Sequence, residues 1–353
     1  MKEENGMGGG LWPCLIFYND NDYESQGKMN SLPEYIDLAI IGAGPHALTL
    51  VAHLLQKKKS VRKRFLVFDP SGVWMQQWHH RFAALEIPHL RSPAVHHPDP
   101  DPHALRSFSS FRHSELFPPY DLPGTQLFQD FCQDVIRRRQ LETCIYPASV
   151  QAVIPENQEG RRRFMLHLST GETIKVRRVV IASGAGTPQM PDWVKKIPTP
   201  YPSERLLHSS AVDLRGLQLA GERILIIGSG LTSGHLAVGA INRGAEVLLM
   251  ARRTIYEKLF DADPGWLGPK YLKHFWAEPD YYQRWQMIQQ ARNGGSMTPA
   301  MMTQLRRLER DGKISIWNQC QVAQAHWRGN HWQICCQNST VHECLVQEKI
   351  DRI

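Results

Sequence analysis

Two glycine-rich turns are the segments of this sequence most suited to chemistry. The first contains Gly42, Gly44 and Ala47, after a short apolar run and before a segment with helical spacing. This spacing permits a tight turn, lets the backbone approach a pyrophosphate and allows a helix to pack closely on a strand. The pyrophosphate would then lie at the positive N-terminus of that helix. The pattern predicts a dinucleotide site, and an ordinary tight turn is the alternative interpretation.

Charged residues distinguish the two turns. Asp69 ends the apolar run that follows the first turn, where a carboxylate can hold a ribose. The second turn begins at Gly228, and the strand after it ends in Arg252-Arg253. A guanidinium at that place favours the 2′-phosphate of NADP over the bare ribose of NAD. A solvated basic pair is the alternative, and Arg252 is the better candidate of the two.

Short strands and helices must position these turns. Apolar runs predict buried strands, and apolar residues at helical spacing predict helices. The predicted strands span residues 35–41, 65–68, 179–182, 224–227, 246–250 and 314–317. The predicted helices span residues 48–55, 125–138 and 299–310, with a further helix between the second turn and Ile241. Alternating segments predict a small antiparallel sheet over residues 149–153, 163–168 and 173–177, and a closing hairpin over residues 332–336 and 341–346.

The composition excludes several classes of protein. The chain has 353 residues, with 41 Lys and Arg against 34 Asp and Glu, and no apolar run long enough to span a membrane. Glu3 and Glu4 stand where a signal peptide needs positive charge, so we predict a cytoplasmic protein with a disordered leader over residues 1–33. Short basic runs fall mostly at predicted helix ends and turns, which favours a solvated surface over nucleic-acid binding.

The cysteines and histidines indicate less about the function than the glycine turns do. The seven cysteines contain no C-x-x-C pair, which argues against a disulfide scaffold, a zinc site or a dithiol redox centre. His96 and His97 with Asp99 and Asp101 are a potential metal-binding group, but three prolines hold this segment extended, so we predict no metal site. Residues 74–123, rich in Pro, His, Trp and Arg, are predicted to form a long structured loop region with short helices. Its histidine-rich stretch is predicted to face a cofactor or substrate.

The order of these motifs resembles that of the class B flavin monooxygenases, flavoproteins with two dinucleotide-binding domains. Residues 181–191 are similar to the family's A-T-G-x-x-x-x-P segment, and Gly72-Val73-Trp74 is similar to its G-x-W segment. Leu207–Ser210 matches part of the family's linker fingerprint. The resemblance implies FAD at the first turn and NADPH at the second. It also implies an α/β fold of two Rossmann-like, three-layer ββα domains, the second inserted in the first.

Within this class, residues 42–48 and Leu85–His97 look most like the ornithine and lysine N-hydroxylating monooxygenases. The resemblance implies that NADPH reduces FAD, that the flavin forms a C4a-hydroperoxide with O2, and that one oxygen atom passes to a small nucleophile, amine N-hydroxylation being favoured. His89 or Arg91 stands where the family has a flavin-facing lysine, so both are substrate-facing candidates; no motif identifies a catalytic residue. The expected cofactor-binding residues are Gly42, Gly44, Pro45, His46, Asp69, Trp74, Trp78, Ala182, Gly184, Gly228, Gly230, Leu231, Thr232, Ser233, Arg252 and Arg253.

The family's layout also implies domain boundaries. An FAD-binding domain is expected over residues 34–210, with residues 340–353 as its returning segment, and an NADPH-binding domain over residues 211–339. In the family the returning strand ends in a turn beside the flavin, so we expect a C-terminally truncated chain with weakened FAD affinity. The expected partners are a small-molecule substrate and O2, without nucleic acid or a membrane, and the sequence defines no oligomeric state.

Two other functions stay open. A flavin-dependent NAD(P)H reductase or disulfide oxidoreductase of the same architecture would use a cysteine pair, for which Cys335-Cys336 is the candidate. A non-catalytic, regulatory relative would keep the nucleotide folds without a complete catalytic assembly. A visible spectrum of the purified protein, before and after NADPH is added in air, would discriminate among the three.

Overall fold

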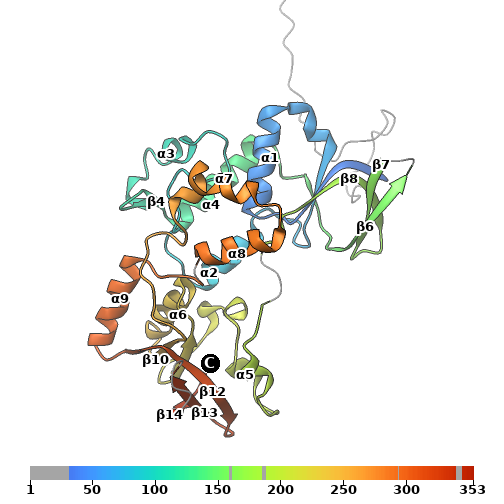
Figure 1. The fold of residues 1–353 in the computed structure, drawn as a ribbon. Helices are drawn as coiled ribbons and strands as arrows, with labels where there is room; N and C mark the ends of the chain where they lie inside the picture. The colour runs from blue at the N-terminus through green and yellow to red at the C-terminus, as the bar shows by residue number, and fades with distance from the viewer. Residues whose placement is uncertain (1–31, 159–160, 185–187, 293, 339–343) are drawn as a thin grey trace, which may run out of the picture. The chain divides into compact units, whose positions relative to one another are not determined.

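The computed structural model describes residues 32–158, 161–184, 188–292, 294–338 and 344–353 (Figure 1). The chain forms two compact units. Unit 1 comprises Met1–His80 and Ser92–Gly186, and unit 2 comprises Arg81–Arg91 and Thr187–Ile353. The predicted leader over residues 1–33 lies outside the described residues except for its last two. Each unit is described by itself below.

Unit 1 is built on a mixed sheet with the strand order β5-β2-β1-β8-β7-β6. Its strands are β1 (Tyr35–Ile41), β2 (Phe65–Phe68), β5 (Ile145–Tyr146), β6 (Val150–Gln158), β7 (Arg161–Leu168) and β8 (Thr173–Ile181), with a separate pair β3 (Leu116–Phe117) and β4 (Leu122–Pro123). Strands β5, β2, β1 and β8 are parallel to their neighbours. Strand β7 pairs antiparallel with β8, and β6 pairs antiparallel with β7. The prediction of separate strands at 173–177 and 179–182 was wrong. A single strand β8 forms because its first half pairs with β7 while nearly its whole length pairs with β1.

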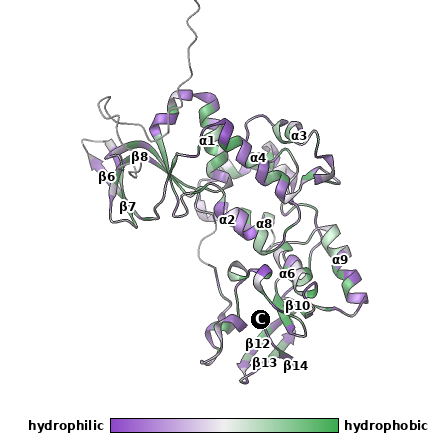
Figure 2. Ribbon diagram, turned by 180° about the vertical axis from the view of Figure 1, so that it is seen from behind, coloured by the Kyte–Doolittle hydropathy of each residue, from purple (hydrophilic) through white to green (hydrophobic). Residues whose placement is uncertain are grey.

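Helices around this sheet follow the apolar spacing of the sequence. They are α1 (Pro45–Lys57), η1 (Lys59–Arg64), α3 (Ala104–Phe108), η2 (His113–Glu115) and α4 (Thr125–Arg138), while the residues of α2 (Gln76–Ala84) divide between unit 1 and unit 2 after His80. Each of α1 and α4 has one buried apolar face, and Figure 2 shows hydrophobic and hydrophilic residues alternating around both. Ile36, Ala39, Leu66 and Phe68 are buried in the core of the sheet. The predicted loop region therefore contains α2 and α3 as short helices.

Unit 2 contains two three-stranded sheets. The first is parallel, in the order β11 (Ile314–Asn318), β10 (Glu246–Ala251) and β9 (Arg223–Ile227). The second is antiparallel and consists of β12 (Cys320–Trp327), β13 (Trp332–Asn338) and β14 (Cys344–Ile350). The helices are α5 (Asp192–Lys195), η3 (Ser203–Arg205), η4 (Ser209–Ala211), η5 (Leu214–Gly216), α6 (Leu231–Ile241), η6 (Pro264–Leu267), α7 (Pro269–Ala277), α8 (Tyr281–Arg292) and α9 (Pro299–Arg310).

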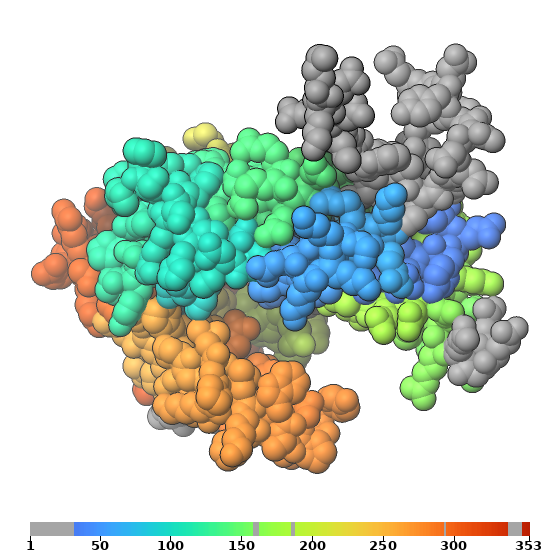
Figure 3. Space-filling view, turned by 90° about the horizontal axis from the view of Figure 1, so that it is seen from above, coloured from blue at the N-terminus to red at the C-terminus, as the bar shows by residue number. Residues whose placement is uncertain are grey.

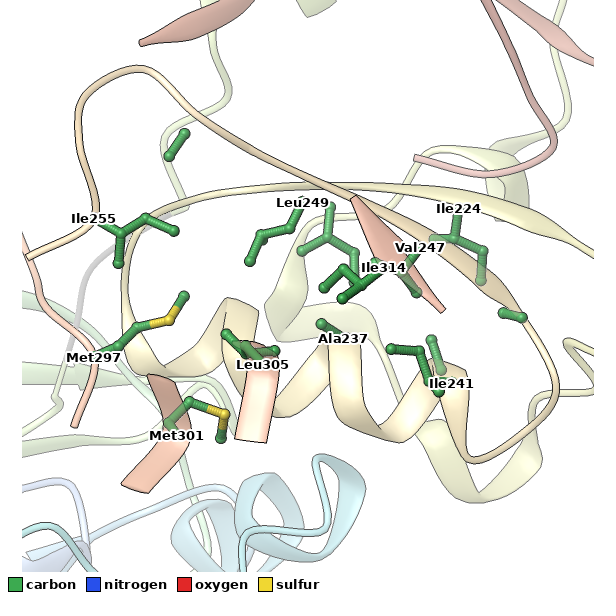
Figure 4. Close-up of a cluster of buried hydrophobic side chains, with 14 of the residues drawn as sticks. Ile224, Ala237, Ile241, Val247, Leu249, Ile255, Met297, Met301, Leu305 and Ile314 are labelled. Carbon is green, nitrogen blue, oxygen red and sulfur yellow. The ribbon is translucent and has the colours of Figure 1, made fainter. Parts of the chain in front are cut away.

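Helices α6 and α9 pack on the parallel sheet of unit 2. Side chains from both helices and all three strands point into one apolar cluster (Figure 4). Gly234 on α6 lies so close to α9 that a Cβ atom there would meet Met301 Cγ at 2.8 Å. This close packing fixes the helix that follows the second glycine turn.

The last residues of the chain extend unit 2. The Leu225 amide donates to the carbonyl of Arg352 at 2.9 Å, and the Asp351 amide donates to the carbonyl of Arg223 at 2.8 Å. These bonds run beside β9, and Ile224 and Arg352 form a parallel bridge. Residues 344–353, expected to return to the first domain, therefore belong to unit 2 in the structure, as do residues 188–210.

The surface of unit 2 carries exposed aromatic residues on α7 and α8, the orange segment of Figure 3. Trp276 is 66% exposed, and Tyr281, Tyr282 and Trp285 are also exposed. No helix in the described part of the chain combines the length and the hydropathy that a membrane crossing requires.

Candidate functional site

The first glycine turn joins β1 to α1 at the carboxyl edge of the unit 1 sheet. Gly42 has a φ of +100°, a left-handed conformation that favours glycine. A Cβ atom at this position would lie 2.6 Å from the carbonyl oxygen of Ala182, which follows β8. The Gly42 amide donates to the carbonyl of Phe68 at 2.8 Å. The turn is therefore packed between the ends of β2 and β8, and both its conformation and its surroundings require glycine.

The start of α1 can accept an anion. Gly44 is the N-cap residue, and no side chain among the described residues caps this helix. A Cβ atom at Gly44 would meet nothing within 4 Å, so the space above it is open. Pro45 occupies the first helical position, where its missing N–H costs nothing, and His46 is exposed beside it. Uncapped backbone N–H groups at a helix N-terminus fit the pyrophosphate of a dinucleotide.

The Asp69 carboxylate faces this turn. Its Oδ2 accepts a hydrogen bond from the amide of Ala43 at 3.0 Å. Its Oδ1 accepts from the amide of Ser71 at 3.0 Å and from the Ser71 hydroxyl at 2.6 Å. Asp69 is half-buried. The structure thus brings together the predicted glycine turn and its acidic residue.

The two predicted tryptophans take different places near the turn. Trp74 is 4% exposed, and its indole N–H donates to the carbonyl of Leu141 at 2.8 Å, so it anchors the core. Trp78 packs against Phe128, with the ring centroids 5.3 Å apart. Sequence reasoning missed Met75, which has a φ of +63° and whose amide donates to the carbonyl of Ala43 at 2.8 Å. Nothing in the residue type of a methionine indicates such a backbone conformation.

The end of β8 completes the edge of the unit 1 sheet. The Ala182 amide donates to the carbonyl of Ile41 at 2.8 Å, and Gly184 has a φ of +77°. Ile181 is 73% exposed although it ends a strand of the sheet. An exposed apolar side chain next to the glycine turn is a surface that a flat ring system could cover. Residues 185–187 of the predicted segment lie outside the described residues.

The second glycine turn joins β9 to α6 in unit 2 and repeats the first. Gly228 has a φ of +150°, and its amide donates to the carbonyl of Met250 at 2.9 Å. The Ser233 hydroxyl lies 2.6 Å from the carbonyl of Gly230 and 3.0 Å from that of Gly228, and so ties the turn together. Gly230 is the N-cap of α6, uncapped by side chains of the described residues and open above its Cα. Leu231 and Thr232 form the first turn of this helix.

The two arginines after β10 have different surroundings. Arg252 is exposed and lines an open pocket of about 1060 Å³ in unit 2. Arg253 packs on the ring of Tyr256, with its guanidinium carbon 5.5 Å from the ring centroid, and its Nη2 donates to the carbonyl of Gly295 at 3.3 Å. A Cβ atom at Gly294 would collide with this guanidinium. Arg253 therefore supports a loop, and Arg252 is the arginine that faces a pocket.

The two substrate-facing candidates both line a smaller pocket of about 190 Å³ in unit 2. The Arg91 guanidinium donates to the carbonyls of Leu259 and Lys258 at 2.8 and 2.6 Å and to the Ser296 hydroxyl at 2.9 Å. Arg91 therefore links loop segments, and burial lowers its pKa. Nδ1 of His89 lies 3.0 Å from the carbonyl oxygen of Leu90.

Sequence reasoning also missed His235, which lines the same pocket from α6. Burial, with a smaller contribution from the charge of His89, lowers the pKa of His235 to about 4. Its imidazole is therefore neutral at pH 7 and can accept a hydrogen bond. Its position on a helix after the glycine turn gave no signal, because the pocket is formed by segments far apart in the sequence.

The histidine-rich segment is held by packing and ion pairing. His97 lies edge-on to Phe131, with the ring centroids 5.0 Å apart. Asp99, whose side chain is 5% exposed, accepts a hydrogen bond from Arg138 at 3.1 Å and from the amide of Asp101 at 3.0 Å. Within the described ranges, no group of three His, Cys, Asp or Glu residues could hold a metal ion.

The vicinal cysteines Cys335 and Cys336 are in different states in the structure. Cys336 is a buried free thiol, and burial, with the charge of Glu348, raises its pKa to about 12. A nucleophilic cysteine needs the opposite shift. Cys335 and Cys144 are each disulfide-bonded.

Comparison with known proteins identifies the family. The model of the L-lysine 6-monooxygenase/L-ornithine 5-monooxygenase family matches residues 34–353. A search of curated protein sequences found no match. Among solved structures, ornithine hydroxylase from Pseudomonas aeruginosa is similar with a TM-score of 0.69 at 17% identity, covering 90% of this chain and 81% of that one.

Two further solved structures share this likeness. L-lysine 6-monooxygenase from Pseudomonas syringae has a TM-score of 0.67 at 16% identity, covering 90% of this chain and 79% of that one. A cadaverine monooxygenase from Erwinia amylovora, bound to FAD, has a TM-score of 0.68 at 16% identity, covering 90% of this chain and 77% of that one. The chain has the α/β fold of these enzymes, and it belongs to the L-lysine 6-monooxygenase/L-ornithine 5-monooxygenase family.

Proposed function

We propose that this chain is an FAD- and NADPH-dependent monooxygenase that hydroxylates the nitrogen of a small amine with O2. The observation that carries the proposal is the pair of glycine turns. Each begins a helix whose N-terminus is uncapped by side chains of the described residues and is open to an anion. The family match over nearly the whole described chain supports it. A neighbouring ornithine N-hydroxylase was solved with reduced FAD, NADP+ and L-ornithine.

In this proposal the two units are two Rossmann-like dinucleotide-binding domains. Unit 1 binds FAD: the start of α1 holds the pyrophosphate, Asp69 holds a ribose, and Ile181 and Ala182 border the flavin. Unit 2 binds NADPH through Gly228–Ser233 and Arg252. The bound flavin would supply the redox chemistry and the activation of O2. The protein residues bind, orient and exclude water.

The substrate is expected to meet His89 and not Arg91. The donors of Arg91 are occupied by loop carbonyls and a hydroxyl, so this side chain cannot turn toward a ligand without releasing those loops. His235 offers a neutral imidazole in a half-open pocket, and His89 lines the same pocket. A neutral imidazole can accept a proton or a hydrogen bond from an amine. Together they are our candidates for positioning the amine nitrogen.

The decisive experiment measures cofactor binding and product together. Purified protein is titrated with FAD, its visible spectrum is followed after NADPH is added in air, and hydroxylamine product is assayed with ornithine, lysine and cadaverine. We expect a flavin spectrum that bleaches with NADPH, recovers with O2 and yields hydroxylamine. NADPH consumption without product from any amine would contradict the proposal.

Variants at the two helix N-termini make this test specific. Gly44→Ala and Gly230→Ala add a methyl group into open space at ordinary φ values, so both proteins should fold normally. The methyl group would block the close approach of a pyrophosphate, so the first variant should lose FAD affinity and the second NADPH affinity. Gly216→Ala, also in open space but away from both turns, is the matched control.

Two alternatives are tested by the same preparations. A disulfide oxidoreductase would lose turnover when Cys335 and Cys336 are replaced by Ser, whereas the buried, high-pKa thiol of Cys336 argues for unchanged turnover. A regulatory relative without catalysis would retain no flavin spectrum at all. In that case the Gly44→Ala variant would be indistinguishable from the parent protein.

A further inference from the structure

The open pocket beside Arg252 contains three cations from two distant parts of the sequence. Arg252 follows β10, and Lys195 and Lys196 lie at the end of α5. Its remaining lining includes the amide side chains of Gln321, Gln324 and Gln337 from the antiparallel sheet, with Gln189 before α5 and Asp192 at its start. Asp192 is the single acidic residue of this lining, so the pocket has a surplus of positive charge.

The position of the pocket relates it to the second glycine turn. The Gly228 amide donates to the carbonyl of Met250, two residues before Arg252. In a parallel dinucleotide fold, the ribose farther from the reactive ring lies at the carboxyl end of this second strand. A dinucleotide whose pyrophosphate lies at the start of α6 would therefore place its adenosine end at Arg252. The pocket volume, about 1060 Å³, leaves room for a nucleotide.

The two lysines are not equivalent. Nζ of Lys195 lies 3.2 Å from Oδ1 of Asp192, which offsets its charge. Lys196 is exposed, and it forms no ion pair within the part of the chain that the structure describes. A phosphate monoester carries nearly two negative charges at neutral pH and prefers several cationic donors. Arg252 alone would leave one of these charges without a partner.

We propose that Lys196 binds the 2′-phosphate of NADPH together with Arg252, and that Lys196 is thereby a specificity-determining residue of this chain. The inference rests on the proposed function, because it assumes that NADPH binds at the second turn. It assigns to residues 188–196 of unit 2 a role in distinguishing NADPH from NADH. Lys195, neutralised by Asp192, contributes less.

The test uses the purified full chain and equilibrium binding instead of turnover. Calorimetry compares 2′,5′-ADP, which carries the 2′-phosphate, with 5′-AMP, which lacks it. The unmodified protein should prefer 2′,5′-ADP. Both Arg252→Gln and Lys196→Gln should lower its affinity for 2′,5′-ADP about five- to tenfold and leave 5′-AMP binding unchanged. Lys196→Arg should retain the preference, and Lys313→Gln, an exposed lysine outside the pocket, is the matched control.

The outcomes separate this inference from the proposed function. If the unmodified protein binds both probes equally, the assignment of NADPH fails and this inference fails with it. If the protein discriminates and Arg252→Gln abolishes the preference while Lys196→Gln retains it, the proposed function stands and the role of Lys196 is overturned. Thermal unfolding of each variant shows that the comparison is made on folded protein.

Discussion

Gly42 is the residue of the first turn whose replacement should cost most. Gly42→Ala would force a side chain into a left-handed backbone and place its Cβ 2.6 Å from the Ala182 carbonyl oxygen. Gly171→Ala has a similar positive φ of +86° but open space around it, so it carries the backbone strain alone. We expect Gly171→Ala to lower the free energy of unfolding by about 1 kcal/mol and Gly42→Ala by at least about 2 kcal/mol more. Urea unfolding measures both free energies. Equal losses of stability in the two variants would show that the end of β8 moves away from the added Cβ atom at no cost.

His235 should make stability depend on pH in a defined window. Its pKa is about 4 in the folded protein, against an ordinary value of 6.5. Above pH 6.5 both states are neutral; between pH 6.5 and 4 the unfolded chain binds a proton that the folded protein excludes. Stability should therefore fall as the pH falls, by about 1.4 kcal/mol per pH unit and about 3 kcal/mol in all.

His235→Gln removes this titration. The difference in unfolding free energy between the variant and the parent protein should change across pH 6.5 to 4 and stay constant from pH 7 to 8. Taking this difference cancels the carboxylates, which titrate in both proteins. A difference that does not vary with pH would mean that His235 is solvated in the folded state.

At the scale of elements, Asp99 fixes the proline- and histidine-rich segment to the last turn of α4. Its buried carboxylate pairs with Arg138 and bonds the Asp101 amide, so no metal ion is needed to hold the segment. We expect Asp99→Asn to lower the free energy of unfolding by about 1 to 3 kcal/mol, because it leaves Arg138 with Asp134 alone. Asp192→Asn, at an exposed ion pair, is the control and should change little.

The same segment gives a test of metal binding. Thermal unfolding of the parent protein should be unchanged by EDTA, since packing and ion pairing account for the segment. A lowered unfolding temperature in EDTA, restored by zinc, would revive a metal site at His96 and His97.

Elements with a regular apolar pattern were predictable from the sequence. The strand Tyr35–Ile41 and the helix Pro299–Arg310 have their predicted bounds, because a short apolar run and helical spacing both depend on near neighbours alone. The continuity of β8 was not predictable, because it depends on pairing with β1, far away in the sequence. The different surroundings of Arg252 and Arg253 likewise depend on a glycine loop some forty residues later in the sequence. Glycine turns could be placed from sequence, whereas the pocket of His89 and His235 required the fold.

At the scale of the whole molecule, the chain enters unit 2 more than once. Residues 81–91 belong to unit 2 although residues on both sides of them belong to unit 1. Within unit 2, Arg243 donates to both carboxylate oxygens of Glu86 at 2.9 Å and holds this segment on α6. A domain boundary predicted from the sequence divides the chain into consecutive segments. The units of the structure are instead defined by contacts between residues that lie far apart in the sequence. Each unit therefore has one glycine turn and is made of two separate stretches of sequence.

Arg352 should stabilise unit 2 without affecting unit 1. Its guanidinium, 12% exposed, donates to both oxygens of Glu222 at 3.0 and 3.2 Å, while its carbonyl accepts from Leu225 in β9. Arg352→Ala leaves a half-buried carboxylate with Arg205 as its remaining partner, which should cost about 1 to 3 kcal/mol. Hydrogen exchange measured by mass spectrometry should quicken in peptides from β9 and β13 and stay unchanged in β1 and β8. Arg352→Lys keeps the charge and should lose less; faster exchange in β1 as well would show that the two units unfold together.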